Sequence, residues 1–245
     1  MTGGDSGAAG PTLVVVAKEC VPGRVKTRLH PPLTLDDAAA VARACLADTL
    51  RALADVPAAR RVLFLDGRAD DPLTLPPEAA AWDVLPQPHG TLDVRLGHLL
   101  DVVDGPLLLV GMDTPQLTAA HLAPVTDPPD LDDPTAPPDV WLGPAADGGY
   151  WALATTAGGA DRARRLPGGP GSLVRGVPMS RADTGALQRA RIEAHGLRVG
   201  RLAALVDVDT ADDLRLVLQD ARPGGALAGL AEPGGVLDGV LVGAA

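Results

Sequence analysis

An uninterrupted run of apolar, mostly β-branched residues near the start of the chain constrains the fold more than any other feature. Residues 12–17 read TLVVVA, with Gly-Pro before them and Lys-Glu after them. A strand without polar alternation is typical of one buried on both faces, and such strands occur mainly in parallel sheets covered by helices. The run therefore predicts a buried strand of an α/β protein.

Strand and helix patterns alternate along the rest of the chain. Further strands are predicted at 61–65, 107–110, 139–142, 150–154 and 203–206. Helices are predicted from Thr34 to Leu53, over 92–103 and after Thr210, and capping boxes formed by Thr34 with Asp37 and by Thr210 with Asp213 mark two of their starts. This alternation predicts a mainly parallel sheet flanked by helices.

Composition limits the classes of function. The 245 residues are enough for one substantial core, which we expect to be aliphatic because only 2% of the residues are aromatic. A formal net charge of -10 disfavours nucleic acid and membrane surfaces as partners. The N-terminal sequence lacks the features of a signal peptide, and the spacing of Cys20 and Cys45 indicates reduced thiols, so we expect a cytoplasmic protein.

The chain is expected to form one domain over residues 1–220. Residues 221–245 are rich in Gly and Ala, which favours a loosely ordered tail over an oligomerisation arm. Residues 126–138 are dense in Pro and Asp and predict a surface loop. The sequence does not indicate the oligomeric state.

A basic segment directly follows the first strand. Residues 18–29 read KECVPGRVKTRL, in which Pro22-Gly23 predicts a turn and Lys18, Arg24, Lys26 and Arg28 supply cations. Lys18 and Lys26 are the only lysines of an acidic chain. Lysine and arginine together can bind several phosphate oxygens, and ligands of open α/β sheets bind at the carboxyl ends of strands. We therefore expect phosphate binding here rather than a solvated turn, although the Walker A pattern is absent.

Acidic residues follow two later strands. Asp113 stands in GMDTP after the strand at 107–110, and Asp207 and Asp209 stand at alternating positions in DVDT. Carboxylates in such places can hold Mg²⁺ or Mn²⁺ next to a nucleotide's phosphates. The alternatives are that Asp113 stabilises a turn before Pro115 and that Asp209 interacts with the dipole of the next helix.

Two weaker motifs complete the candidate site. In GPAADGGY, Gly148 and Gly149 would let a ligand approach the backbone, so Asp147 to Tyr150 is the candidate acceptor site, with an ordinary Asp-Gly turn as the alternative. In QPHGTLDVRL, Gln87 and Gly90 are candidates for contact with a base or ribose and Arg95 for a phosphate, whereas the alternative is a loop leading into a helix.

Together, the motifs KxxVPGxVKTRL, QxxGxLxxRL, GMDTPxL, LGPAxDGGYW and DVDTxxDL resemble a known bacterial family. The chain is similar over about 13–218 to the glycosyltransferase-like proteins called transferase 1, radical-SAM/selenodomain-associated, of the GT-A nucleotide-diphospho-sugar transferase superfamily. That family is regarded as similar to 2-phospho-lactate guanylyltransferase. Cys20 stands where the family usually has proline, and the segment 177–180, VPMS, differs from the family's Trp-Ser-Thr-like element.

The resemblance implies a single GT-A domain that binds a nucleotide over 18–28, including Gly23 and Arg24. It also implies a divalent cation near Asp113 and Asp209 and an acceptor near Asp147. Three functions stay open: nucleotidyl transfer from an NTP to a phosphorylated small molecule, glycosyl transfer from a nucleotide sugar, and nucleotide binding without turnover. The single Asp113 in place of a DxD motif, together with the number of cations in the basic loop, favours nucleotidyl transfer.

Overall fold

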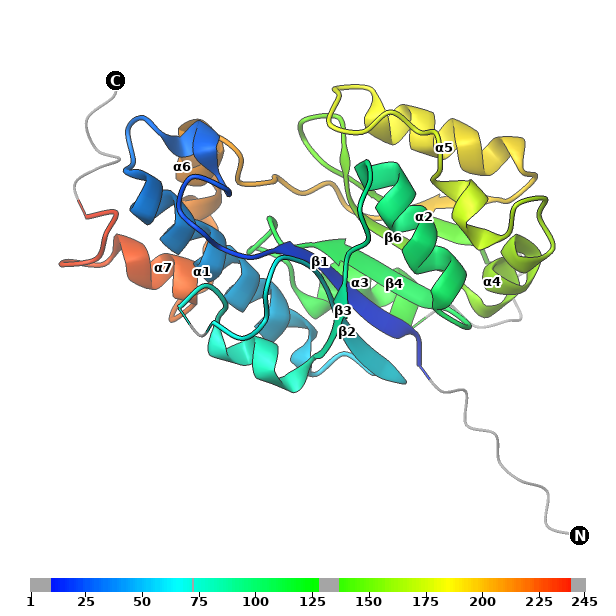
Figure 1. Ribbon diagram of the computed structural model, residues 1–245, viewed down its shortest axis with the longest axis horizontal. Helices are drawn as coiled ribbons and strands as arrows, with labels where there is room; N and C mark the ends of the chain where they lie inside the picture. The colour runs from blue at the N-terminus through cyan, green and yellow to red at the C-terminus, as the bar shows by residue number, and fades with distance from the viewer. Residues whose placement is uncertain (1–9, 72, 128–136, 239–245) are drawn as a thin grey trace, which may run out of the picture.

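The protein is an α/β fold built on one mixed, mainly parallel sheet (Figure 1). The computed structural model describes residues 10–71, 73–127 and 137–238. In these ranges the sheet has seven strands in the order β3-β2-β1-β4-β6-β5-β7, and β6 alone runs antiparallel to its neighbours. The strands are β1 (Thr12–Lys18), β2 (Arg60–Asp66), β3 (Asp83–Pro86), β4 (Leu107–Gly111), β5 (Val140–Pro144), β6 (Tyr150–Thr155) and β7 (Val199–Arg201). The predicted fold class is therefore confirmed.

Helices cover both faces of the sheet. They are α1 (Leu35–Ala54), α2 (Leu92–Val102), α3 (Ala119–Thr126), α4 (Ala157–Arg164), α5 (Thr184–Ala194), α6 (Ala211–Gln219) and α7 (Ala226–Ala231), with 3₁₀ turns η1 (Thr27–Leu29), η2 (Pro77–Ala81) and η3 (Pro170–Leu173). Within the described ranges, no helix has both the length and the hydropathy needed to cross a bilayer.

The central strand β1 is buried on both faces, as the apolar run predicted. Leu13 and Val15 belong to a core cluster with α1 and α3, whereas Val14 packs with α2, α4 and α5 on the other face. Figure 1 shows α2, α4 and α5 grouped on one side of the sheet and α1 on the other. This layering leaves the ends of the strands available for loops that carry polar side chains.

A third cluster lies on the outer side of α1, where α6 and α7 pack (Figure 1). Leu214 and Val217 of α6 and Leu227 of α7 are buried there against α1 residues such as Val41. We expected the domain to end with α6, but α7 follows it and packs in the same cluster against α1. The loosely ordered tail expected after Arg222 is likewise not observed over 226–238, because α7 forms and Leu227 and Leu237 are buried.

The strand predicted at 203–206 is wrong. The last strand lies earlier, at Val199–Arg201, and the later segment makes only an isolated bridge between Ala145 and Leu205. The last residue of β5, Pro144, has no N–H to donate to a continued ladder. Most of the loop predicted at 126–138 lies outside the described residues.

The strand order brings the candidate motifs to one edge of the sheet. Strands β1 and β4 are parallel neighbours, with Val16 opposite Gly111. Their carboxyl ends therefore meet, and the basic loop after Lys18 lies beside the segment that contains Asp113.

Candidate functional site

The basic loop leaves β1 through a tight turn and returns to the core at Val25 and Leu29. The backbone N–H of Arg24 donates to the carbonyl of Val21 at 3.0 Å, and Gly23 has a φ of 77°, a region that favours glycine. Val25 and Leu29 are buried, and they anchor the loop on either side of Lys26 and Arg28. The alternation of apolar anchors and cations holds the charged side chains at the edge of the sheet.

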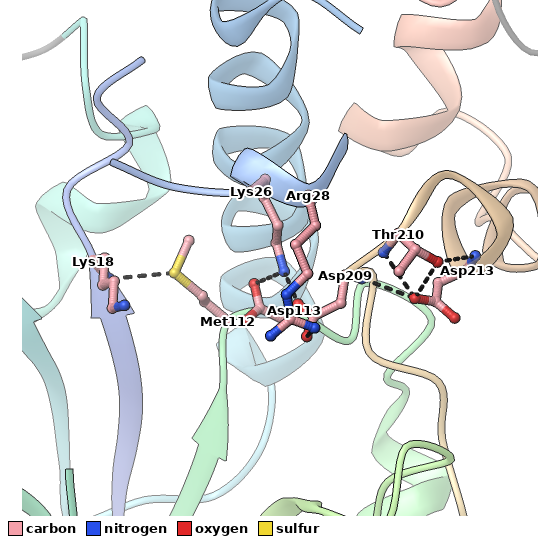
Figure 2. Close-up of polar contacts among 8 residues, drawn as sticks. All are labelled: Lys18, Lys26, Arg28, Met112, Asp113, Asp209, Thr210 and Asp213. Carbon is pink, nitrogen blue, oxygen red and sulfur yellow. Dashed lines mark hydrogen bonds and ion pairs between the residues drawn. The ribbon is translucent and has the colours of Figure 1, made fainter. Parts of the chain in front are cut away.

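Lys26 forms the centre of the candidate site (Figure 2). Its Nζ lies 2.7 Å from Oδ1 of Asp113 and 3.1 Å from Oδ1 of Asp209. Arg28 reaches the other oxygen of Asp209, with Nη1 3.4 Å from Oδ2. Residues that are far apart in the sequence, and that were predicted to lie together, are therefore in direct contact.

The ammonium of Lys26 is covered, but it stays charged. Only 5% of its side chain is exposed, whereas Asp113 and Asp209 are about one-third exposed, at 36% and 33%. Burial by itself would lower the pKa of Lys26, but the charges of Asp113 and Asp209 outweigh this effect and raise the pKa above its usual value. The site thus holds a fixed positive charge between two carboxylates.

The acidic segment is positioned by its own backbone and by the helix that follows it. The N–H of Val208, which is fully buried, donates to the carbonyl of Asp113 at 2.9 Å. The capping box predicted for α6 is present, since the hydroxyl of Thr210 accepts from the N–H of Asp213 at 3.2 Å and Oδ2 of Asp213 accepts from the N–H of Thr210 at 2.8 Å. The backbone N–H of Asp209 also donates to Asp213 at 3.3 Å (Figure 2). These bonds fix the direction of the Asp209 side chain.

Asp207 has a different environment from Asp209. No hydrogen bond or ion pair to its side chain is found in the part of the chain that the structure describes. Burial, followed by the negative charges of Asp113 and Asp147, raises the pKa of Asp207 to about 7. Asp113, Asp147 and Asp209 therefore lie within electrostatic reach of Asp207. Lys26 and Arg28 are the cations found in contact with Asp113 and Asp209.

The carboxylate oxygens at this edge of the sheet are suitable ligands for a hard divalent cation. Mg²⁺ and Mn²⁺ prefer carboxylate oxygens, and four carboxylates against two fixed cations leave an excess of negative charge at this edge. No preformed cluster of three or more His, Cys, Asp or Glu ligands occurs among the described residues. The position between Asp113 and Asp209 is taken by the ammonium of Lys26, so these residues fit a metal once that ammonium moves.

The other predicted cations lie outside this cluster. The backbone N–H of Lys18 donates to Sδ of Met112 at 3.2 Å, and the exposed lysine lies apart from Lys26 in Figure 2. Arg24 is 60% exposed in its side chain and lies 3.8 Å from Glu19. Both are accessible to an anionic ligand, but neither contacts Asp113 or Asp209.

Gln87, Gly90 and Arg95 form a connected group at the ends of β1 and β2. The amide nitrogen of Gln87 donates to the carbonyls of Ala17 at 3.1 Å and Phe64 at 2.8 Å. The guanidinium of Arg95 contacts the carbonyl of Gly90 at 2.8 Å and the side-chain oxygen of Gln87 at 3.2 Å. Their side chains organise the 87–91 loop, and direct contact with a base or a phosphate stays a prediction.

The candidate acceptor loop is held by the segment before α5. The carbonyl of Gly148 accepts from the N–H of Gly185 at 2.8 Å, and a Cβ at Gly148 would lie 1.9 Å from the carbonyl oxygen of Ala182. Oδ1 of Asp147 accepts from the N–H of Gly149 at 2.8 Å, which is the turn that we considered as the alternative. Asp147 is nevertheless exposed, and it lies close enough to Asp207 for its negative charge to raise the pKa of Asp207.

The side chain of Tyr150 packs against the core cluster on the α2, α4 and α5 side of the sheet. Its hydroxyl donates to Oε1 of Gln188 at 3.5 Å, and burial raises its pKa. Acceptor binding by the side chain of Tyr150 therefore stays a prediction without a contact in its favour.

Sequence reasoning missed two acids that organise the site. Glu19 has only 8% of its side chain exposed, and it accepts from the N–H of Arg68 at 3.0 Å and from the hydroxyl of Thr74 at 3.3 Å. Asp66, the last residue of β2, lies 2.7 Å from Nη1 of Arg95. An acid directly after a buried strand was the signal that identified Asp113, and the same signal would have found both.

The fold defines a class of protein. It is similar to a presumed nucleotide-diphospho-sugar transferase from Desulfovibrio desulfuricans, with 22% identity, a TM-score of 0.73, and coverage of 94% of this chain and 96% of that one. It is also similar to 2-C-methyl-D-erythritol 4-phosphate cytidylyltransferase from Thermus thermophilus, with 14% identity, a TM-score of 0.50, and coverage of 85% and 97% respectively. The protein therefore has the fold of the nucleotide-diphospho-sugar transferases.

The family follows from the sequence. Residues 49–181 match the model of the family described as "Uncharacterized protein conserved in bacteria (DUF2064)", and the chain belongs to that family. No curated protein matches the chain.

Proposed function

We propose that the protein is a nucleotidyltransferase that transfers NMP from an NTP to a phosphorylated small molecule. The observation that carries the proposal is the convergence of Lys26 and Arg28 with Asp113 and Asp209 at the carboxyl ends of β1 and β4. Cations together with carboxylates at this edge of an α/β sheet suit a polyphosphate with a divalent metal. The fold shared with a cytidylyltransferase is compatible with this chemistry.

In the proposed reaction, a phosphate oxygen of the acceptor attacks the α-phosphorus of the NTP. The bond between that phosphorus and the oxygen bridging to the β-phosphate breaks, and pyrophosphate leaves with the bonding electron pair. Lys26 and Arg28 would stabilise the charge on the leaving group, with Lys18 at the mouth of the loop. Gly23, Arg24 and Arg95 would bind the phosphates, and Gln87 and Gly90 would contact the base or ribose.

Asp113 and Asp209, with Asp207 beside them, would hold Mg²⁺ or Mn²⁺. Bound there, the metal would neutralise charge on the phosphates. The acceptor would lie over Asp147, Gly148 and Gly149, beside the same carboxylates. We propose further that the protein is a Mg²⁺-dependent enzyme of the cytoplasm and that its ligands are an NTP and a small acceptor.

Glycosyl transfer from a nucleotide sugar is the second candidate. The exposed carboxylate of Asp147 favours it, because such a group can act as a base toward an acceptor hydroxyl. Nucleotide binding without turnover is the third, since the segment 177–180 that leads to α5 differs from the family's pattern.

A product assay separates the three functions. The protein is incubated with Mg²⁺, each NTP and a panel of sugar phosphates and other phosphorylated acceptors, and pyrophosphate is measured. We expect pyrophosphate that depends on both NTP and acceptor. UDP or another nucleoside diphosphate released from a nucleotide sugar, without pyrophosphate, would establish glycosyl transfer instead, and binding without either product would favour the third function.

Lys26→Ala tests the site directly. We expect kcat/KM to fall at least about 30-fold, or about 2 kcal/mol, the usual cost of one electrostatic contact to a transition state. Arg60→Ala is the matched control, because Arg60 stands at the start of β2 in an exposed pair with Asp83. An unchanged kcat/KM in Lys26→Ala would exclude the role.

A further inference from the structure

The ammonium of Lys26 and the proposed metal compete for the same oxygens. Lys26 contacts Oδ1 of both Asp113 and Asp209, and Arg28 contacts Oδ2 of Asp209. Both oxygens of Asp209 therefore have a cationic partner already. A divalent cation that bridged the two aspartates would meet the ammonium at short range, where like charges repel strongly.

The conformation of Lys26 indicates that its contacts hold it in this position. Its φ is 48° and its ψ is 33°, a left-handed conformation that L residues other than Asn and Asp seldom adopt. The N–H of Leu29 donates to the Lys26 carbonyl at 2.9 Å, and the two ion pairs hold the side chain. Among the described non-glycine residues, only Ser180 shares a positive φ.

We propose that Lys26 is a counter-ion switch: its ammonium neutralises Asp113 and Asp209 in the ligand-free protein, and it transfers to the phosphates when a divalent cation takes its place. This inference rests on the proposed function, and it adds an order of events. The flexible four-carbon stem of lysine allows the movement, and no other lysine belongs to the loop between Glu19 and Leu29.

The switch makes metal and nucleotide binding depend on each other. A metal alone must displace the ammonium and leave it without an anionic partner, so binding of the metal alone is weak. An NTP supplies phosphate oxygens that pair with the displaced ammonium, so each ligand strengthens the binding of the other to the same extent. Arg28 is 69% exposed and can stay beside Asp209 or follow the phosphates.

Mn²⁺ binding without nucleotide tests the switch. Free Mn²⁺ is measured by electron paramagnetic resonance with the wild type, Lys26→Met and Arg24→Met, the last being a control that removes one exposed cation of the same loop. We expect Lys26→Met to bind Mn²⁺ at least about tenfold more tightly than the wild type, within the usual range of coupling between sites, and Arg24→Met to change the affinity less than about threefold.

Equal or weaker Mn²⁺ binding by Lys26→Met would overturn the switch, and so would an equal gain in Arg24→Met. If neither the wild type nor Lys26→Met bound Mn²⁺ with or without NTP, the metal site of the proposed function would itself be contradicted, and this inference with it. If the wild type bound Mn²⁺ only with NTP while Lys26→Met bound it alone, the switch would be supported.

A second measurement does not require Lys26→Met to fold. The chain has only two lysines, so ¹⁵N labelling of the lysine Nζ gives two ammonium signals, and Lys18→Met assigns them. Lys26 should give a protected signal in the ligand-free protein, and saturating Mg²⁺ together with a non-hydrolysable NTP should shift or broaden it. A Lys26 signal that stays in place when both ligands are bound would overturn the switch.

Discussion

Asp48 on α1 is expected to hold the C-terminal helix α7 in place. Its side chain is 3% exposed, and its two oxygens accept from the N–H groups of Ala226 at 2.7 Å and Leu227 at 2.9 Å. These N–H groups open α7 and have no intrahelical acceptor, so a carboxylate stabilises them both by hydrogen bonding and by its charge. Replacing Asp48 should therefore loosen α7.

The magnitude follows from these bonds. A net hydrogen bond to a charged group contributes about 1.5 to 3 kcal/mol, and two buried N–H groups left without an acceptor add to the cost. Part of this is recovered, because the buried carboxylate no longer has to be desolvated. We expect Asp48→Ala to lower the free energy of unfolding by about 3 kcal/mol, and Asp48→Asn, which keeps one acceptor oxygen, by about 2 kcal/mol.

Urea denaturation followed by circular dichroism measures both variants against the wild type. Asp55→Ala is the control, because Asp55 is an exposed aspartate just after the same helix, and its loss should change stability by less than about 0.5 kcal/mol. A loss below about 1 kcal/mol in Asp48→Ala would show that the capping bonds do not stabilise the fold.

Three further predictions concern the framework of the site. Thr210→Ala removes the cap of α6, and we expect a loss of about 1 kcal/mol in urea denaturation, with no change as the contrary result. Gly148→Ala should lower the free energy of unfolding by more than about 2 kcal/mol, on the order of a core disruption, because its Cβ would meet the Ala182 carbonyl. The control Gly196→Ala, also at positive φ but in open space, should lower it by only about 1 kcal/mol. Equal losses would contradict the close contact at Gly148. Cys20 and Cys45 should resist iodoacetamide at about pH 8 in the folded protein and react in urea. Alkylation needs the thiolate, and burial raises the pKa of both thiols, that of Cys20 to about 12. Rapid alkylation of the folded protein would contradict this prediction.

Local sequence signals predicted the elements that depend on local physics. The run at 12–17 became β1, and Thr34 and Thr210 cap α1 and α6 as their spacing with Asp37 and Asp213 indicated. Each of these elements is specified by residues that lie within a few positions of one another, so the local sequence is enough to predict it.

Elements that depend on distant partners were not predicted. β7 has three residues and no apolar alternation, and it forms because β5 offers it an edge. Helix α7 forms next to Asp48, which is about 180 residues earlier in the chain. Nothing near either segment signals these partners.

The sequence identified the residues of the candidate site more fully than it predicted the contacts between them. Lys26, Asp113 and Asp209 were identified, and the order of the strands explains why the first two meet. The contact between the Lys26 ammonium and both carboxylates was not foreseen, because the sequence suggested a lysine for phosphate and aspartates for metal. Gln87 and Arg95 were identified for a ligand, yet they contact the protein itself, because the ends of β1 and β2 carry carbonyls and Asp66 that only the fold brings near them.

The binding of a metal and a triphosphate at the carboxyl ends of β1 and β4 is best tested by a crystal structure of the protein soaked with Mg²⁺ and a non-hydrolysable NTP. We expect a metal ion bridging Asp113 and Asp209, with the triphosphate against Lys26 and Arg28. A triphosphate bound at another face of the sheet, or one bound here with Lys26 still between the two aspartates and no metal, would contradict it.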